Sequence, residues 1–198
     1  MPIIGTLAGA SARSLGGLRT FGSALAGPND YESIASYTVT GSATSNITFS
    51  SIPSTYRHLQ VRGLVRTTQN AIQNGCKMEF NGDTGSNYNW TQVYTSSGNT
   101  PVQEAFVNQS SLNLGELPSA NATANVFGFV LADIYDYTNT NKYTTYFETG
   151  GSERNGSSQI GNNWGVWKST SVVNSIKLFE PSSNWAVGSM FALYGIKG

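Results

Sequence analysis

YRHLQVRGLVRT, residues Tyr56–Thr67, is the stretch of sequence that decides the fold. Its residues alternate in character, because Leu59, Val61 and Val65 fall on one parity and mostly polar residues such as His58 fall on the other. Side chains of a β-strand point alternately to its two faces. The pattern therefore predicts a strand with one buried and one exposed face.

Strand-like runs continue on both sides of this stretch. Residues 126–137 (VFGFVLADIYDY) are apolar on both parities, which predicts a central strand buried on both faces. A turn at 139–141 predicts a hairpin with the run at 143–148. The remaining runs are short and rich in β-branched, aromatic or alternating apolar residues, and they cover 37–40, 46–50, 77–80, 102–107, 110–115, 164–169, 172–180 and 190–197.

Two segments predict loops rather than strands. Residues 85–121 are looser in pattern and predict a long excursion around two short strands, and 150–163 is rich in Gly, Asn and Ser. The chain then holds about eight to ten strands, with turn signals at the spacing typical of an all-β sandwich. We expect an all-β fold, an antiparallel β-sandwich of jelly-roll type, with an incomplete barrel as the alternative.

The first thirty residues differ in composition from the rest of the chain. They are rich in Gly, Ala, Ser and Leu, and no acid precedes Asp30. Such a segment cannot bury enough apolar surface to fold alone. We therefore expect two parts, an extended attachment arm at 1–30 and a sandwich body at 31–198. The expected contact residues of the arm are Ile3, Ile4, Leu7, Arg13, Leu15, Leu18, Arg19 and Phe21.

The composition argues against several classes of partner. Charged residues make up 11% of the chain and the formal net charge is zero, so we expect no nucleic-acid surface. The chain has no Lys/Arg cluster for an anionic membrane and no apolar run long enough for a transmembrane helix. The one cysteine, Cys76, rules out an intramolecular disulfide and is expected to be a small buried side chain.

Residues suited to catalysis or metal binding are scarce. His58 is the only histidine and is expected to be an ordinary surface or interface residue rather than a base or a zinc ligand. The Asp-Thr-Gly triplet at 83–85 is interpreted as a turn, and calcium binding by Asn81 and Asp83 is the lesser alternative. The sequence predicts no cofactor and no enzymatic activity.

Asp133 and Asp136 form the most suggestive carboxylate pair. Glycoside hydrolysis needs two carboxylates acting together. These two lie three positions apart, which on one strand points them to opposite faces. We expect each to bind a turn or to pair with an arginine of the neighbouring strand, such as Arg62 or Arg66.

Aromatic residues allow one alternative function. Trp90, Tyr94, Trp164 and Trp167 lie in or beside the predicted loops, where they could form a platform that stacks on a glycan. Aromatic side chains also fill sandwich cores and subunit interfaces. We favour a place in the core or at a subunit interface over glycan binding for these four residues.

Several stretches together resemble small virion proteins of tailed bacteriophages, particularly those of cyanobacterial and marine phages. They are ITFSSIPSTYRHLQVR at 47–62, FNGDTGSNY at 80–88, DIYDYTNTNK at 133–142 and FALYGIK at 191–197, with GASAR at 9–13 in the arm. The resemblance covers most of the chain. It implies a jelly-roll body, oligomerisation that is often trimeric, and attachment to the particle, and it brings no catalytic residues.

Two functions follow as expectations. The first is a capsid cement or decoration protein of the virion, which binds copies of itself and lays its arm on the major capsid protein or another virion protein. Arg13 and Arg19 would then pair with carboxylates of the shell. The second is a tail-fibre or receptor-binding protein whose loops bind a host glycan.

Overall fold

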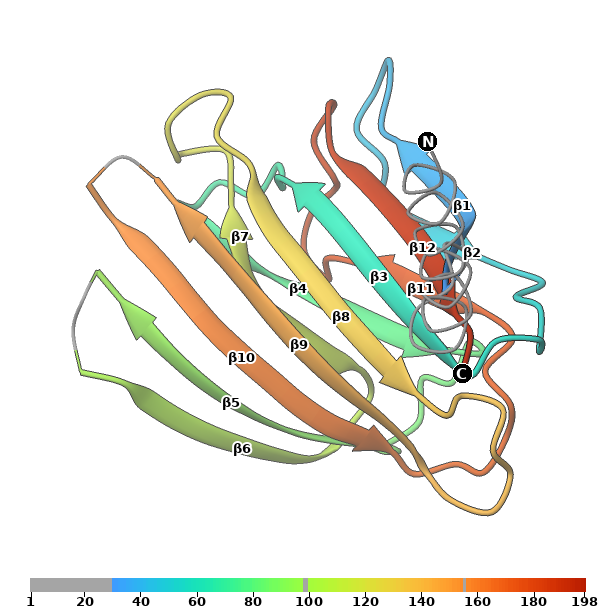
Figure 1. The fold of residues 1–198 in the computed structure, drawn as a ribbon. Coiled ribbons are helices and arrows are strands. Elements are labelled where there is room, and N and C mark those ends of the chain that lie inside the picture. Colours follow the sequence, from blue (N-terminus) through green and yellow to red (C-terminus); the bar gives the residue numbers. More distant parts are fainter. Residues whose placement is uncertain (1–29, 98–99, 155) are drawn as a thin grey trace, which may run out of the picture.

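The computed structural model describes residues 30–97, 100–154 and 156–198, which form an all-β fold of twelve strands in two antiparallel sheets (Figure 1). The predicted all-β sandwich is therefore confirmed. The predicted arm contacts from Ile3 to Phe21 lie outside the described residues. Within the described ranges, no helix is long and apolar enough to cross a membrane.

Eight strands form the large sheet, which crosses the whole molecule (Figure 1). Every neighbouring pair in it is antiparallel. In spatial order the strands are β1 (Tyr31–Thr38), β12 (Met190–Ile196), β3 (His58–Val65), β8 (Gly128–Tyr135), β9 (Thr144–Glu153), β10 (Ser158–Trp167), β5 (Tyr88–Ser96) and β6 (Val102–Gln109).

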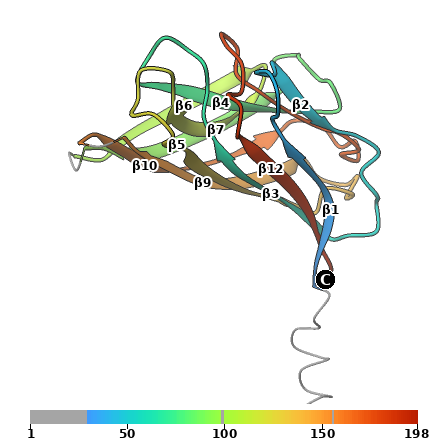
Figure 2. The ribbon, with the colours of Figure 1, turned by 90° about the horizontal axis from the view of Figure 1, so that it is seen from above.

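Four strands form the small sheet, which covers one face of the large sheet (Figure 2). In spatial order they are β2 (Asn46–Phe49), β11 (Ile176–Phe179), β4 (Gln73–Phe80) and β7 (Leu112–Pro118). The core lies between the sheets, and its largest fully buried side chains include Trp185, Tyr88, Tyr137, Phe80 and Leu59. The opposite face of the large sheet has no described layer over it (Figure 2).

The burial pattern of β3 agrees with the alternation of the sequence at Tyr56–Thr67. In β3 the side chains of Leu59, Val61 and Val65 are buried in the core, whereas Arg62 and Leu64 are exposed on the other face. The central position of the 126–137 run is also confirmed, because β8 is the fourth strand of the eight. Its predicted burial on both faces is wrong, since β8 alternates between buried and outward side chains such as Phe129.

The two predicted loops are strands, which corrects the sequence interpretation. Residues 85–121 contain all of β5, and 150–163 contains parts of β9 and β10. The glycines of β10 are there for close packing. A Cβ at Gly161, within the segment predicted as a loop, would lie 2.8 Å from the carbonyl oxygen of Val93 and 2.7 Å from Cβ of Tyr94. Glycine in this strand therefore lets the neighbouring backbone approach and does not mark a turn.

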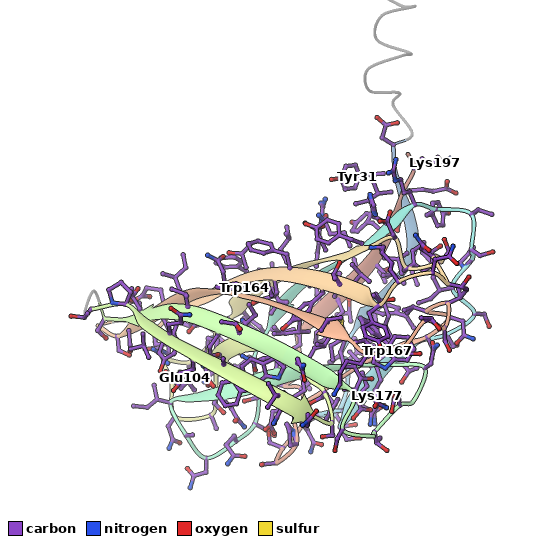
Figure 3. The ribbon with its side chains drawn as sticks, turned by 90° about the horizontal axis from the view of Figure 1, so that it is seen from below. Tyr31, Glu104, Trp164, Trp167, Lys177 and Lys197 are labelled. Carbon is purple, nitrogen blue, oxygen red and sulfur yellow. The ribbon has the colours of Figure 1, made fainter. Side chains whose placement is uncertain are left out.

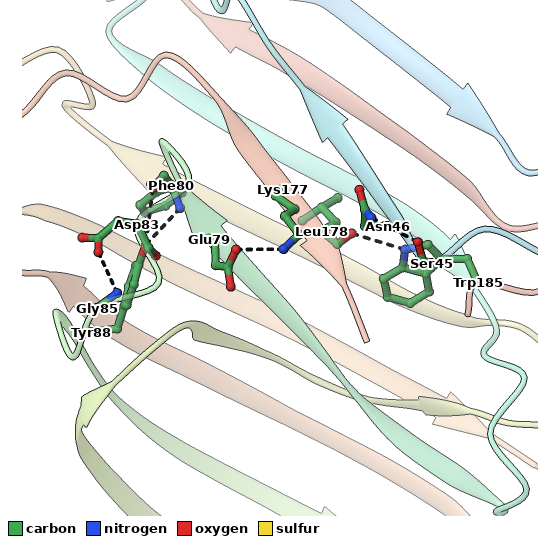
Figure 4. A network of polar contacts seen from close by, with 10 residues as sticks. All are labelled: Ser45, Asn46, Glu79, Phe80, Asp83, Gly85, Tyr88, Lys177, Leu178 and Trp185. Carbon is green, nitrogen blue, oxygen red and sulfur yellow. Dashed lines mark hydrogen bonds and ion pairs between the residues drawn. The ribbon is translucent and has the colours of Figure 1, made fainter. Parts of the chain in front are cut away.

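Polar contacts link strands of the small sheet to each other and to the buried Trp185 (Figure 4). Lys177 on β11 pairs with Glu79 on β4 at 3.1 Å, and the indole N–H of Trp185 donates to the carbonyl of Leu178 at 3.3 Å. The sheets thus match the predicted sandwich. The jelly-roll connectivity is a finer statement that the strand order does not establish, and it stays a prediction.

Candidate functional site: the outward face of the large sheet

The candidate site is the face of the large sheet that the small sheet does not cover, called here the outward face. In an antiparallel ladder, residues directly opposite one another point to the same side. The pairings therefore align side chains into rows that cross the sheet from β12 to β10. Two of these rows carry most of the exposed apolar side chains.

The first row is apolar along most of its length. Met190 pairs with Leu64, Leu64 with Phe129, and Phe129 lies across Gly151 from Ile160. These four side chains are 40–58% exposed. A groove of about 490 Å³ runs over β1, β12, β3 and β8 in this part of the face, and Leu64, Phe129 and Met190 line it.

The second row lies four residues further along the strands. It contains Tyr194, Gln60, Asp133, Phe147 and Trp164 in order across the sheet. Phe147 and Trp164 are directly opposite each other and are 37% and 41% exposed. Figure 3 shows Trp164 and Tyr31 standing on this face.

The charges near the centre of the outward face are already paired within the molecule. The Arg62 guanidinium donates to the Gln60 side-chain oxygen at 2.6 Å, and the Gln60 amide donates to the Asp133 carboxylate at 2.7 Å. The same guanidinium lies 4.6 Å from the ring centroid of Tyr194 and 5.6 Å from that of Tyr31. One cation and one anion are thus linked through a neutral amide, so covering the centre of this face would leave neither Arg62 nor Asp133 without a partner.

The four aromatic residues proposed for glycan binding do not form one platform. All four lie in strands β5 and β10 rather than in loops. Only Trp164 points outward. Trp90 and Trp167 are 7% and 3% exposed and face the core, and Tyr94 has the same parity as Trp90.

The two inward tryptophans have structural contacts of their own. Trp90 stacks on Phe106 with ring centroids 4.0 Å apart. The Trp167 indole N–H donates to the Asp83 carboxylate at 2.7 Å. Neither ring has a free face for a sugar, so of the four candidates Trp164 alone is exposed on the outward face.

The predicted turn at 83–85 is confirmed by its hydrogen bonds. The Asp83 carboxylate accepts from the Gly85 backbone N–H at 2.9 Å and from the Asn87 amide. Burial would raise the pKa of Asp83, but the hydrogen bonds from Trp167, Asn87 and Gly85 lower it below its ordinary value. Residues 30–97, 100–154 and 156–198 contain no group of three or more His, Cys, Asp or Glu side chains placed to hold a metal ion.

The carboxylates expected to pair with arginine do so only in part. Asp133 reaches Arg62 through Gln60, as described above. Asp136 forms ion pairs with Lys142 at 3.1 Å and Arg57 at 3.5 Å, and the hydrogen bond from Lys142 is the main cause of its lowered pKa. The prediction for Arg66 is wrong, because its buried guanidinium donates to four backbone carbonyls of 120–126 instead.

Cys76 is placed as the sequence predicted, whereas the surface or interface role expected of His58 stays a prediction. His58 is half-buried, and its Nδ1 accepts the backbone N–H of Asp136 at 2.9 Å. Cys76 is a fully buried core side chain, and burial raises the pKa of its thiol well above the ordinary value.

A polar cluster between the sheets was not predicted. Glu148 on β9 is fully buried, and its Oε2 accepts the Asn163 amide at 2.6 Å. Asn163 in turn accepts from Asn113 on β7, which also accepts from Lys77. Burial raises the pKa of the Glu148 carboxyl to about 8, although the hydrogen bond from Asn163 opposes that shift.

Sequence reasoning missed the outward face itself, although a signal was present. Leu64 is an apolar residue on the polar parity of its strand. Apolar residues on both parities of 126–137 predicted burial, and in the structure the second parity is the exposed one. A strand that is apolar on both faces in a sheet covered on one side only leaves an apolar surface free.

Comparisons with known proteins identify no family for this chain. No family model matches it, and no curated protein matches it. Among solved structures, it is similar to a PL-14 alginate lyase from Aplysia kurodai, with 10% identity over 73% of this chain and 71% of that chain and a TM-score of 0.28. It is also similar to scytalido-glutamic peptidase, with 10% identity over 79% and 66% of the two chains and a TM-score of 0.20. Likenesses this weak carry no argument about function.

Proposed function

We propose that this chain is a non-enzymatic structural protein of a bacteriophage particle, a capsid cement or decoration protein that associates with copies of itself and with the major capsid protein. The observation that supports the proposal best is the uncovered apolar outward face of the large sheet. Apolar surface of this extent on a soluble protein marks a site of association.

The low charge of the chain agrees with this role. Charged residues are 11% of the sequence, and Asn, Ser, Thr and Gly supply most of the polar surface. A protein that remains attached to a shell does not depend on electrostatic steering toward a partner. Residues 1–30 supply the proposed anchor, because small residues allow close backbone approach and Arg13 and Arg19 can bind carboxylates.

Deletion of residues 1–30 tests the anchor. The full chain is expected to bind isolated phage capsids in hundreds of copies per particle, and the deleted chain is expected to lose this binding. Cosedimentation with capsids, followed by protein quantification, measures both. Equal binding by the two chains would contradict the anchor, and about six to eighteen copies per particle would contradict the capsid location.

A tail-fibre or receptor-binding role is the second candidate, and the pairing of Trp164 with Phe147 favours it. Two exposed aromatic rings lie opposite each other, with Thr91 beside Trp164 in the same row. Aromatic faces stack on sugar rings, and hydroxyl and amide groups bind sugar hydroxyls. This use competes with association through the outward face, since a ring covered by a partner cannot hold a glycan.

Replacing Trp164 with Ala separates the two candidates. The receptor role predicts weaker adsorption of phage to cells, with attachment of the protein to the particle unchanged. The decoration role predicts unchanged adsorption, together with particles that lose resistance to heat when the protein is absent. Adsorption and particle survival are measured on the same preparation.

A further inference from the structure

We propose that the outward face packs against the same face of a second copy of this chain. The inference deepens the proposed function, on which it rests, by naming the surface through which copies associate. It commits to one arrangement, in which a two-fold axis runs along the strands between β8 and β9.

The first argument is area. Eight large apolar side chains on the outward face are at least 36% exposed. Fully buried aromatic residues contribute roughly 150–250 Å² each, so this set exposes on the order of 700 Å². A standard interface buries about 800 Å² on each partner. The set consists of Tyr31, Leu64, Phe129, Tyr135, Phe147, Ile160, Trp164 and Met190.

The second argument is the symmetry of the strand order. The axis between β8 and β9 lies between the fourth and fifth of eight strands, which is the middle of the sheet. It therefore places β10 of one copy over β3 of the other and leaves no strand of the large sheet unmatched. Such an interface is isologous, because the same patch serves both copies.

The third argument is the match of shape along the first row. The axis keeps each row at the same height, so Ile160 of one copy comes over Leu64 of the other. Ile160 is the most exposed of the eight side chains, at 58%. Leu64 lines the 490 Å³ groove, together with Phe129 and Met190. A protruding apolar side chain thus meets an apolar groove, and this occurs twice.

The fourth argument is charge. In this arrangement Arg62 on β3 faces Asn162 on β10, and Asp133 on β8 faces Phe147 on β9. Neither Arg62 nor Asp133 meets a like charge, and each keeps its hydrogen bond to Gln60. The desolvation cost of covering the face is therefore reduced by pairing that already exists.

The test is the mass of the full chain in solution, measured by sedimentation between about 1 and 100 µM. The wild-type chain is expected to associate in this range. Ile160→Asp and Leu64→Asp are each expected to weaken association at least tenfold, because each places a carboxylate in the apolar contact. Circular dichroism confirms that both variants remain folded, which is expected because the two side chains are exposed.

Ile72→Asp is the matched control. Ile72 is 54% exposed and precedes β4 on the small-sheet side, so the same substitution removes the same kind of apolar surface elsewhere. It is expected to leave the association unchanged. An equal effect of the three substitutions on association would overturn the proposal. So would a wild-type chain that stays monomeric over the whole concentration range, or a trimer whose association is unchanged by Ile160→Asp.

Capsid binding of the same variants keeps this inference separate from the proposed function. If the chain associates through Ile160 but does not bind capsids, the proposed interface is supported and the decoration role is contradicted. A monomeric chain whose capsid binding is lost in Leu64→Asp would mean that the shell covers this face, which would overturn the second copy as its partner.

Discussion

Trp164 and Trp167 lie on the same strand, β10, and face opposite sides of the large sheet. Trp164 is 41% exposed on the outward face, whereas Trp167 is 3% exposed and hydrogen-bonded to Asp83. Truncating a buried aromatic side chain costs about 3–5 kcal/mol, and exposed substitutions usually cost about 0.5 kcal/mol or less. Trp167→Ala is therefore expected to be strongly destabilising and Trp164→Ala nearly neutral.

Chemical denaturation of the two variants at low protein concentration checks this expectation. Low concentration keeps association through the outward face from adding to the stability of the wild-type chain. A loss of stability in Trp164→Ala as large as that in Trp167→Ala would contradict the assignment of the two faces.

Gly165 is expected to tolerate no side chain. Its Cβ would overlap the Asn89 carbonyl and press on the Trp90 backbone, so Gly165→Ala must push β5 away from β10. Overpacking of this kind costs roughly 1–3 kcal/mol. Gly75→Ala on β4 is the control, because its Cβ would meet no atom closer than 3.4 Å. Thermal unfolding of the pair is expected to show a lower midpoint for Gly165→Ala only.

The glycines also show why part of the fold could not be predicted from the sequence. Alternation over Tyr56–Thr67 predicts the burial of β3 correctly, because the polarity of each side chain indicates whether the face it points to is buried or exposed. Gly150, Gly151 and Gly161 of β9 and β10 have no side chain that could show such a pattern, and they were assigned to a loop. The role of Gly161 appears only when it is seen opposite Tyr94 in the neighbouring strand. Contacts with the neighbouring strand determine which residue fits at such a position, and a single sequence does not show which strands are neighbours.

The candidate site was even less predictable than the fold. The large sheet has an exposed apolar face because the four-stranded small sheet covers only one of its sides, and no described layer covers the other. Sequence reasoning named Trp164 only within the alternative glycan platform, where it was grouped with Tyr94 and with Trp90 and Trp167, which belong to the core. Parity along β10 would have separated Trp164 from Trp167 once the segment had been recognised as a strand.

Arg66 is expected to be essential for the segment between β7 and β8. Its guanidinium donates to the carbonyls of Thr123, Val126 and Ala122 at 2.7–2.9 Å and to that of Ala120 at 3.3 Å. Arg66→Lys keeps the charge but loses the planar fork, so the lysine cannot donate to all four carbonyls. We expect a loss of about 1–3 kcal/mol, which is the cost of leaving a buried group such as the Ala122 carbonyl without a donor.

Limited proteolysis adds a local readout for Arg66→Lys. Cleavage within 119–127 is expected to be faster than in the wild-type chain, while the sheets remain protected. Arg62→Lys is the comparison, because Arg62 is exposed and its loss does not release this segment. A proteolytic pattern shared by both variants would argue against a specific role for Arg66.

Glu148 is expected to make the stability of the protein depend on pH. Its carboxyl is buried with a pKa of about 8, against an ordinary value near 4.5, so the folded state keeps a proton that the unfolded state loses. Stability from this group is complete below about pH 4.5 and is lost as the pH rises toward 8, by at most about 1.4 kcal/mol per pH unit.

Glu148→Gln isolates this contribution. The amide is neutral at every pH, and its oxygen can still accept the hydrogen bond from Asn163 that Oε2 accepts in the wild-type chain. The difference in unfolding free energy between variant and wild type is therefore expected to grow in favour of the variant from pH 5 to pH 8 and to level off above that. Other titrating groups, such as Glu116, cancel in the difference. Unfolding by urea at four or five pH values measures it, and a difference that stays constant across this range would show that Glu148 is ionised in the folded protein.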